Sequence, residues 1–198
     1  MSVDLIKAGY NQAAPAYNRD RGFLKSGKYV RRLLQLLPAT AQILDLGCGS
    51  GLPIDRELLN QNHLVTGLDI SETQIAAAKK NCPRGEFLVK DISQLKPGEY
   101  AVDAVISFYT IFHLPRTKHQ RLLKTIASFL PKNGLLLITM GDRDFEGMHN
   151  FYGVNMWSSH YGPVKNSRLV KAAGFSILTD EIDNSGREKH QIILAKKS

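Results

Sequence analysis

The stretch Ile43-Leu44-Asp45-Leu46-Gly47-Cys48-Gly49-Ser50-Gly51 decides the fold class of this chain of 198 residues. Its mostly apolar start predicts a strand over 43–46, and three glycines follow at alternate positions. Glycine lets the backbone turn sharply and approach a ligand closely. Pro53 suits a first helical turn, so a helix is predicted over about 53–60. A strand, a glycine-rich turn and a helix in this order are typical of a doubly wound α/β sheet.

Short apolar runs alternate with helical patterns along the rest of the chain, which favours a parallel sheet covered by helices. Further strands are predicted over 63–70, 86–90, 101–109, 135–140, 175–182 and 189–195. Helices are predicted over 3–37, 71–81, 116–130 and 166–173, the second opened by a capping box at Ser71. A turn over 183–187 joins the last two strands into an antiparallel hairpin. We expect a single domain over 1–198.

Residues 141–163 break this rhythm, because they mix Gly, Asp, Met, His and aromatic residues without a clear period. A long irregular stretch inside a compact domain is usually a functional loop. We therefore expect 141–165 to be an insertion on the substrate side of the site.

Acidic residues accompany the glycine turn. Asp69 ends the second predicted strand, where a carboxylate can accept hydrogen bonds from both ribose hydroxyls. Asp45 lies two residues before the turn, where it would repel a pyrophosphate and suit a ligand with an ammonium group. The glycine spacing also departs from the dinucleotide fingerprint, because Leu52 stands where that fingerprint needs its third glycine. The pattern therefore argues against a nicotinamide-dependent oxidoreductase.

Asp45-x-Gly47-x-Gly49-x-Gly51 after an apolar strand resembles motif I of the class I S-adenosylmethionine-dependent methyltransferases. Further stretches fit the same family in register: Asp69, the pair Asp91-Ile92, the fourth-strand motif 102–107, the turn 131–137 and the N-terminal pattern Tyr10-Asn11-x-x-Ala14-x-x-Tyr17. The last resembles a helix that closes over the cofactor in the small-molecule branch of the family. Tyr10 and Tyr17 are seven residues apart, so the alternative that both simply face the core stays open.

The resemblance implies a seven-stranded, mainly parallel Rossmann-like sheet in the order 3-2-1-4-5-7-6, with one antiparallel strand and helices on both faces. It also implies a helical lid over 1–38 and S-adenosyl-L-methionine as the cofactor. The residues expected to bind that cofactor are Tyr10, Tyr17, Asp45, Gly47, Cys48, Gly49, Gly51, Asp69, Ile70, Asp91, Ile92, Ser107 and Phe108.

Methyl transfer depends on holding donor and acceptor in line, and it needs a base only if the acceptor keeps its proton at neutral pH. The residues expected to take part in catalysis are His113, His160 and Tyr161, and those expected to contact the substrate are Tyr109 and Trp157. His119, between Lys118 and Gln120, is expected to face solvent. The histidines show no spacing typical of a metal site.

Composition leaves the acceptor open. A small molecule is favoured, because little chain remains for a recognition domain and a lid would enclose the pocket. The net charge of +8 keeps an RNA or protein acceptor as an alternative, although nucleic acid is not favoured without a recognition motif. A binder without catalysis is a third alternative.

The two cysteines lie far apart in the sequence, which favours the reducing cytoplasm. No apolar run reaches the about 18 residues that are needed to span a bilayer. Nothing in the sequence fixes the oligomeric state.

Overall fold

The computed structural model describes residues 3–21, 27–185 and 189–198, and within the first helix it describes the side chains of 5–14. The helices are α1 (Val3–Arg21), α2 (Gly27–Leu34), α3 (Ile54–Asn60), α4 (Glu72–Asn81), α5 (His119–Phe129) and α6 (Pro163–Ala172), with short 3-10 helices η1 (Ile92–Gln94), η2 (Ile111–His113) and η3 (Arg116–Lys118). The strands are β1 (Gln42–Leu46), β2 (Leu64–Asp69), β3 (Glu86–Val89), β4 (Ala104–Ser107), β5 (Leu135–Gly141), β6 (Phe145–Phe151), β7 (Val154–His160), β8 (Phe175–Asp183) and β9 (His190–Lys197).

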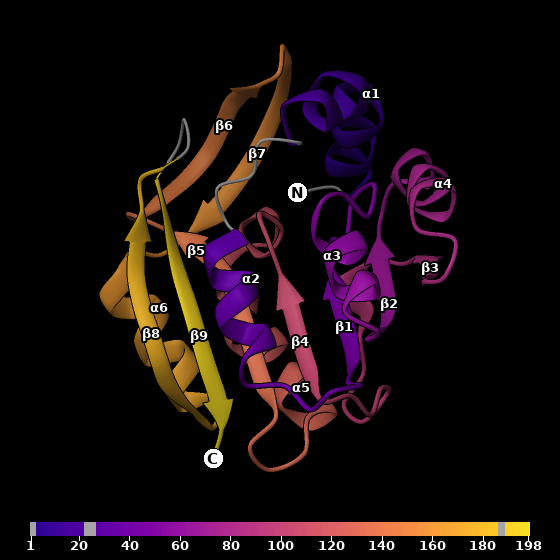
Figure 1. Ribbon diagram of the computed structural model, residues 1–198. Helices are drawn as coiled ribbons and strands as arrows, with labels where there is room; N and C mark the ends of the chain where they lie inside the picture. Colours follow the sequence, from indigo (N-terminus) through magenta and orange to yellow (C-terminus); the bar gives the residue numbers. More distant parts are fainter. Residues whose placement is uncertain (1–2, 22–26, 186–188) are drawn as a thin grey trace.

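Seven strands form one sheet in the order β3-β2-β1-β4-β5-β9-β8 (Figure 1). β9 runs antiparallel to both β5 and β8, and the other neighbours are parallel. Within this sheet β8 and β9 are the sixth and seventh strands along the chain. The predicted order 3-2-1-4-5-7-6, with one antiparallel strand, is therefore confirmed.

The central strand β5 shows why helices cover both faces, since all seven of its residues are buried. Leu135 and Leu137 join an apolar cluster with α2, α3 and α4. Leu136 and Ile138 point the other way and join a cluster with α5 and α6. Side chains alternate between the faces of a strand, so a strand that is apolar throughout needs a cover on each side. Figure 1 shows α2 in front of the sheet and α6 behind it.

The stretch expected to be an irregular insertion is instead the antiparallel hairpin β6–β7. Tyr152 and Gly153 form its two-residue loop, both with positive φ (52° and 81°), as in the type I′ turn that suits twisted strands. The prediction of irregular structure was wrong because apolar and polar residues do not alternate along β6, and this alternation is the signal that predicts a strand. Only the exposure of the side chains alternates. Gly147 and His149 lie on the half-buried face, and Met148 lies on the exposed face.

The N-terminal helix α1 lies against this hairpin and against α4 (Figure 1). Ile6 packs with Met156 and Trp157 of β7. On the other side Lys7 pairs with Glu72, and Asn11 is hydrogen-bonded to Ser71, the N-cap of α4.

Where the sequence predicts one helix over 3–37, the described residues form α1 and α2. Residues 22–26 lie outside the description, as do the side chain of Tyr17 and part of the predicted turn over 183–187. No helix within the described ranges is long and apolar enough to cross a membrane.

Candidate functional site

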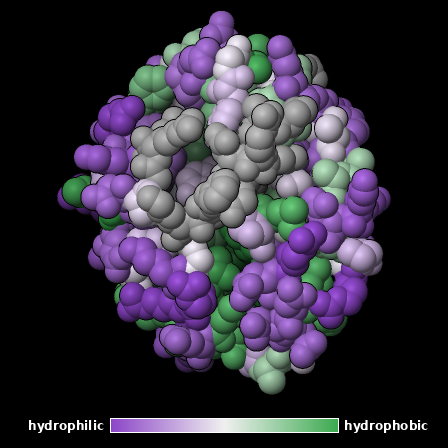
Figure 2. All heavy atoms as spheres, turned by 45° about the horizontal axis from the view of Figure 1, so that its top comes forward, coloured by the Kyte–Doolittle hydropathy of each residue, from purple (hydrophilic) through white to green (hydrophobic). Residues whose placement is uncertain are grey.

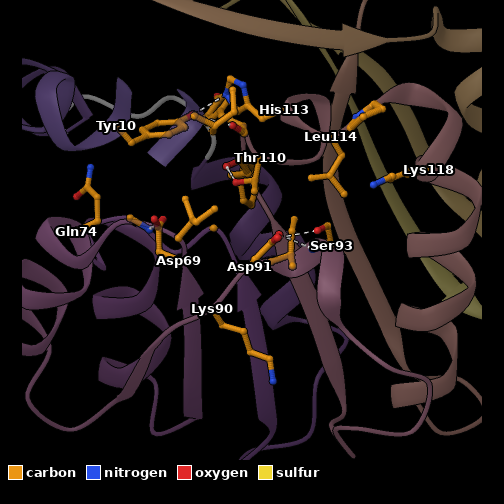
Figure 3. Close-up of a pocket in the computed structure, with 18 residues that line it drawn as sticks. Tyr10, Asp69, Gln74, Lys90, Asp91, Ser93, Thr110, His113, Leu114 and Lys118 are labelled. Carbon is orange, nitrogen blue, oxygen red and sulfur yellow. Dashed lines mark hydrogen bonds between the residues drawn. The ribbon is translucent and has the colours of Figure 1, made fainter. Parts of the chain in front are cut away.

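A pocket lies at the carboxyl edge of the parallel strands, between the sheet and α1 (Figure 3). Ligands of open α/β sheets bind at this edge, outside the strand ends where the strand order reverses. Seen from this side in Figure 2, hydrophobic residues lie scattered among a larger number of hydrophilic ones. The pocket is lined by Ile6, Tyr10, Gly47, Gly49, Asp69, Ile70, Gln74, Lys90, Asp91, Ile92, Ser93, Phe108, Tyr109, Thr110, His113, Leu114, Pro115 and Lys118.

The glycine turn after β1 forms the floor of the pocket. Its backbone is fixed to β2, because the N–H groups of Gly47 and Cys48 both donate to the Leu68 carbonyl, at 2.7 and 3.0 Å. Gly47 has a φ of +82°, and a Cβ at this position would overlap the Thr110 side chain. Only glycine therefore lets the turn pass so close to the segment that follows β4.

Two carboxylates stand on the pocket wall in fixed orientations. The Asp69 carboxylate accepts from the N–H groups of Gly49 and Ser71, each at 2.9 Å, and so ties the glycine turn to the start of α4. The Asp91 carboxylate accepts from the N–H and the hydroxyl of Ser93, at 2.8 and 2.7 Å (Figure 3). Asp69 ends β2, Asp91 lies two residues after β3 as the N-cap of η1, and both line the pocket.

The segment after β4 supplies the opposite wall. Ser107 is fully buried and donates to the Leu46 carbonyl at 2.7 Å, which joins β4 to β1 behind the pocket. Tyr109 has a φ of +59°, and its N–H donates to the Thr139 hydroxyl at 2.6 Å. This hydrogen bond holds the backbone in a conformation that is uncommon outside glycine. The bend places Phe108, Tyr109 and Thr110 on the lining.

His113 is 8% exposed and contacts two elements that lie far away in the sequence. Its Nε2 lies 2.7 Å from the Tyr10 hydroxyl of α1, and its Nδ1 lies 3.0 Å from the Trp157 carbonyl of β7. Burial lowers the pKa of His113 from 6.5 to about 4, so the ring is neutral at pH 7. Figure 3 shows Tyr10 and His113 together above the acidic wall.

Two lysines line the pocket in different states. The Lys90 amine forms an ion pair with Glu99, whose hydrogen bond raises the pKa of the lysine. Lys118 is exposed at the other end of the pocket, and no ion pair involves it among the described residues. Within the described ranges no group of His, Cys, Asp and Glu is arranged to hold a metal ion.

The structure brings many of the sequence-predicted residues together but not all of them. Those on the lining are Tyr10, Gly47, Gly49, Asp69, Ile70, Asp91, Ile92, Phe108, Tyr109 and His113. Asp45, Cys48, Gly51 and Ser107 do not line the pocket. Asp45, Cys48 and Ser107 are 3% exposed or less, and Gly51 lies against Cys82 of α4, which places these four residues behind the pocket surface.

The expectations for the hairpin need correction, since Trp157, His160 and Tyr161 do not reach the pocket. The Trp157 side chain packs with Ile6 and Met156 under α1. His160 lies next to the Arg143 carbonyl, 2.7 Å from its Nδ1, and the Tyr161 ring lies 5.2 Å from the Arg116 guanidinium. Strand alternation places Trp157 and His160 on opposite faces of β7, and Tyr161 lies beyond the end of the strand, so the aromatic cluster does not form one surface.

His119 was expected to face solvent, and this prediction was wrong. It is fully buried, and its Nε2 lies 3.2 Å from the Leu114 carbonyl, the acceptor of that hydrogen bond. The signal was present in the sequence, because His119 precedes Leu122, Leu123 and Ile126 at helical spacing and so belongs to the apolar face of α5.

Sequence reasoning missed eight lining residues: Ile6, Gln74, Lys90, Ser93, Thr110, Leu114, Pro115 and Lys118. Position alone could have indicated Gln74 and Thr110, because the first follows β2 and the second follows β4 at the ligand-binding edge. Nothing in the local pattern indicates Ile6 or Lys118, which reach the pocket through tertiary packing.

The sheet order and the glycine turn with its flanking acids define a Rossmann-like domain of methyltransferase topology. A family model described as "Methyltransferase domain" matches residues 43–134. Over these residues the chain is therefore similar to methyltransferase domains, in agreement with the resemblance seen in the sequence.

Named relatives agree with this assignment. Trans-aconitate 2-methyltransferase of Escherichia coli is 32% identical over 149 residues, which are 74% of this chain and 56% of the relative. Malonyl-[acyl-carrier protein] O-methyltransferase of Bacillus cereus is 31% identical over 156 residues, which are 73% of this chain and 56% of the relative. The chain thus spans about half the length of the curated relatives it matches.

Solved structures share the fold. A 1,6-didemethyltoxoflavin-N1-methyltransferase from Burkholderia thailandensis, with bound 1,6-didemethyltoxoflavin and S-adenosylhomocysteine, superposes with a TM-score of 0.74. It is 18% identical, and the match covers 96% of this chain and 84% of the other. At this identity the match shows a common fold.

Proposed function

We propose that this domain transfers a methyl group from S-adenosylmethionine to a small-molecule acceptor. The observation that carries the proposal is the joint placement of the glycine turn, Asp69 and Asp91 on the lining of one pocket. The two curated relatives, named for methylation of trans-aconitate and of a malonyl group, support the choice of reaction.

The residues present fit this cofactor. Gly47 and Gly49 bring the backbone of the turn onto the pocket lining, where a ligand is able to lie against it. Asp69 and Asp91 present carboxylates whose natural partners are hydroxyl and amino groups, as on a ribose and an adenine. Ile70, Ile92 and Phe108 add apolar surface that suits a flat base. Asp69 and Asp91 also favour a ligand that carries positive charge.

When bound, S-adenosylmethionine supplies an electrophilic methyl group on a positively charged sulfur. The residues of the chain orient the reactants and exclude water. Tyr10 and Ile6 of α1 cover the pocket from above, and Tyr109 and Thr110 form the wall on the β4 side. Most of the rate enhancement then comes from holding acceptor and donor in line within a closed pocket.

The acceptor is proposed to be a small acid, tested first because one curated relative is named for trans-aconitate. An ionised carboxylate carries no proton that a base must remove. Exposed Lys118 at the end of the pocket adds a positive charge that favours an anion.

The compartment is proposed to be reducing, as in the cytoplasm, because Cys48 and Cys82 are both free thiols.

Calorimetric titration with S-adenosylhomocysteine tests the cofactor assignment. We expect binding to the unmodified protein and a roughly tenfold or greater loss for Asp69→Asn, since hydrogen bonds to a charged group contribute about 1.5–3 kcal/mol. Asp103→Asn is the matched control, because Asp103 lies at the opposite edge of the sheet and accepts from the Gln42 N–H. Binding of NADH instead of S-adenosylhomocysteine would overturn the proposal.

Release of S-adenosylhomocysteine with a panel of acceptors tests the reaction. Turnover with small carboxylic acids is the expected result. Turnover only with RNA or protein, or binding without any turnover, would replace the small-molecule acceptor with one of the alternatives that the sequence left open.

A further inference from the structure

His113 joins α1, which covers the pocket, to β7, which lies beside it. α1 contributes the Tyr10 hydroxyl and β7 contributes the Trp157 carbonyl, each within hydrogen-bond distance of one ring nitrogen of His113. The histidine itself ends η2, directly after the β4 wall. One buried ring thus connects the cover of the pocket, the hairpin beside it and the sheet below.

The hydrogen bonds define the tautomer. A backbone carbonyl only accepts, so the proton of the neutral ring must lie on Nδ1 and point at the Trp157 carbonyl. Nε2 then carries the lone pair and accepts from the Tyr10 hydroxyl. Both nitrogens of His113 are therefore engaged by the protein itself, which leaves neither of them to take a proton from an acceptor in this arrangement.

The remaining contacts of α1 lie on either side of this junction. Lys7 pairs with Glu72, and Asn11 is hydrogen-bonded to Ser71, at the start of α4. On the other side Gly9 lies so close to Met156 that a Cβ would overlap its sulfur. The pair of Tyr10 and His113 holds the middle of the helix, over the pocket that both residues line.

We propose that His113 is a positioning residue, which acts through Tyr10 to hold α1 closed over the bound cofactor. This role deepens the proposed function, since it gives the pocket its closed form. It replaces the expectation from the sequence that His113 removes a proton from the acceptor.

A double-mutant cycle tests the coupling of the two side chains. Tyr10→Phe removes only the hydroxyl, and His113→Asn keeps a donor near the Trp157 carbonyl while it removes the Nε2 acceptor. Each single variant is expected to weaken S-adenosylhomocysteine binding about two- to tenfold. The double variant is expected to bind no more weakly than the single variant with the larger loss of affinity. Losses that multiply would overturn the proposal, because they would show two independent contacts.

A second measurement needs no cofactor. Hydrogen exchange of the α1 amides, together with the emission of Trp157, which is the only tryptophan of the chain, reports whether α1 stays docked. Faster exchange and a shifted emission are expected in Tyr10→Phe and in His113→Asn. Tyr29→Phe, a buried tyrosine of α2 that does not line the pocket, is the matched control and should leave both unchanged.

The two measurements separate the claims. If the unmodified protein binds no S-adenosylhomocysteine but the variants release α1, the proposed function fails and the junction stands. If exchange and emission are the same in Tyr10→Phe as in the unmodified protein, His113 does not hold α1 through Tyr10, whatever the cofactor does.

Discussion

Gly47 shows how much a single residue decides in this site. Its positive φ and its contact with Thr110 mean that any side chain both strains the backbone and displaces the wall after β4. Gly98 has a similar φ of +73°, yet nothing lies within 4 Å of the place where its Cβ would be. The two glycines therefore separate backbone strain from steric overlap.

We expect Gly98→Ala to lower the free energy of unfolding by about 1–2 kcal/mol, the cost of a left-handed conformation for a residue with a Cβ, and Gly47→Ala to lower it further because its Cβ also overlaps Thr110. Only Gly47→Ala should also abolish S-adenosylhomocysteine binding, because only this Cβ meets the pocket wall. Urea unfolding and calorimetry measure the two effects. An equal loss of affinity in both variants would contradict the steric argument.

His119 gives stability a dependence on pH. Burial lowers its pKa from 6.5 to about 4, so between these values the unfolded chain binds more protons than the folded one. The free energy of unfolding should therefore be highest above pH 6.5 and fall as the pH drops toward 4.

His119→Gln keeps a donor for the Leu114 carbonyl and removes the titration. Between pH 7 and pH 5 the unmodified protein should lose roughly 2 kcal/mol more stability than this variant. Urea unfolding at the two pH values measures the difference. Parallel losses in the two proteins would mean that His119 is protonated equally in the folded and unfolded chains.

At the scale of elements, the hairpin β6–β7 is what the sequence hides best. The strand β6 presents Gly147 and His149 inward and Met148 outward, so no apolar alternation marks it. The inner strands of the main sheet, such as β4 and β5, are predictable because they are almost wholly apolar and buried. Contacts such as that of Tyr10 with His113, 103 residues apart, leave no trace in any local period.

Met156 is the residue through which the hairpin supports α1. It is fully buried between Ile6 and Trp157, so Met156→Ala should lower the free energy of unfolding by about 2–5 kcal/mol and speed the exchange of α1 amides. Met148→Ala on the exposed face of the same hairpin is the control, with a change within about 0.5 kcal/mol. Similar losses in the two variants would show that the hairpin does not pack on α1 as described.

At the scale of the whole molecule, the order of the sheet was predictable because the resemblance placed five motifs in register along it. The extent of the pocket was not predictable, because α1 and η3 reach it from opposite sides through tertiary packing alone. The core was predictable from the apolar runs of the sequence. Within it β5 lies between β4 and β9.

Leu137 on β5 is the sharpest probe of that core. It is fully buried among α2 and the sheet, so Leu137→Ala should cost about 2–5 kcal/mol in the free energy of unfolding. Leu64→Ala, on a strand residue that is 60% exposed, should cost far less. Thermal unfolding of the two variants side by side measures the contrast, and equal midpoints would be inconsistent with the burial described for β5.

The insertion of β9 between β5 and β8 has a consequence for synthesis on the ribosome. Among the described residues β8 pairs in the sheet with β9 alone, so it stays detached until residues 190–197 have left the exit tunnel. Until then a nascent chain presents the bare flank of β5, whose unsatisfied amides and carbonyls invite mispairing. The first five strands are thus able to assemble during translation, and the second half of the sheet is completed in one late step.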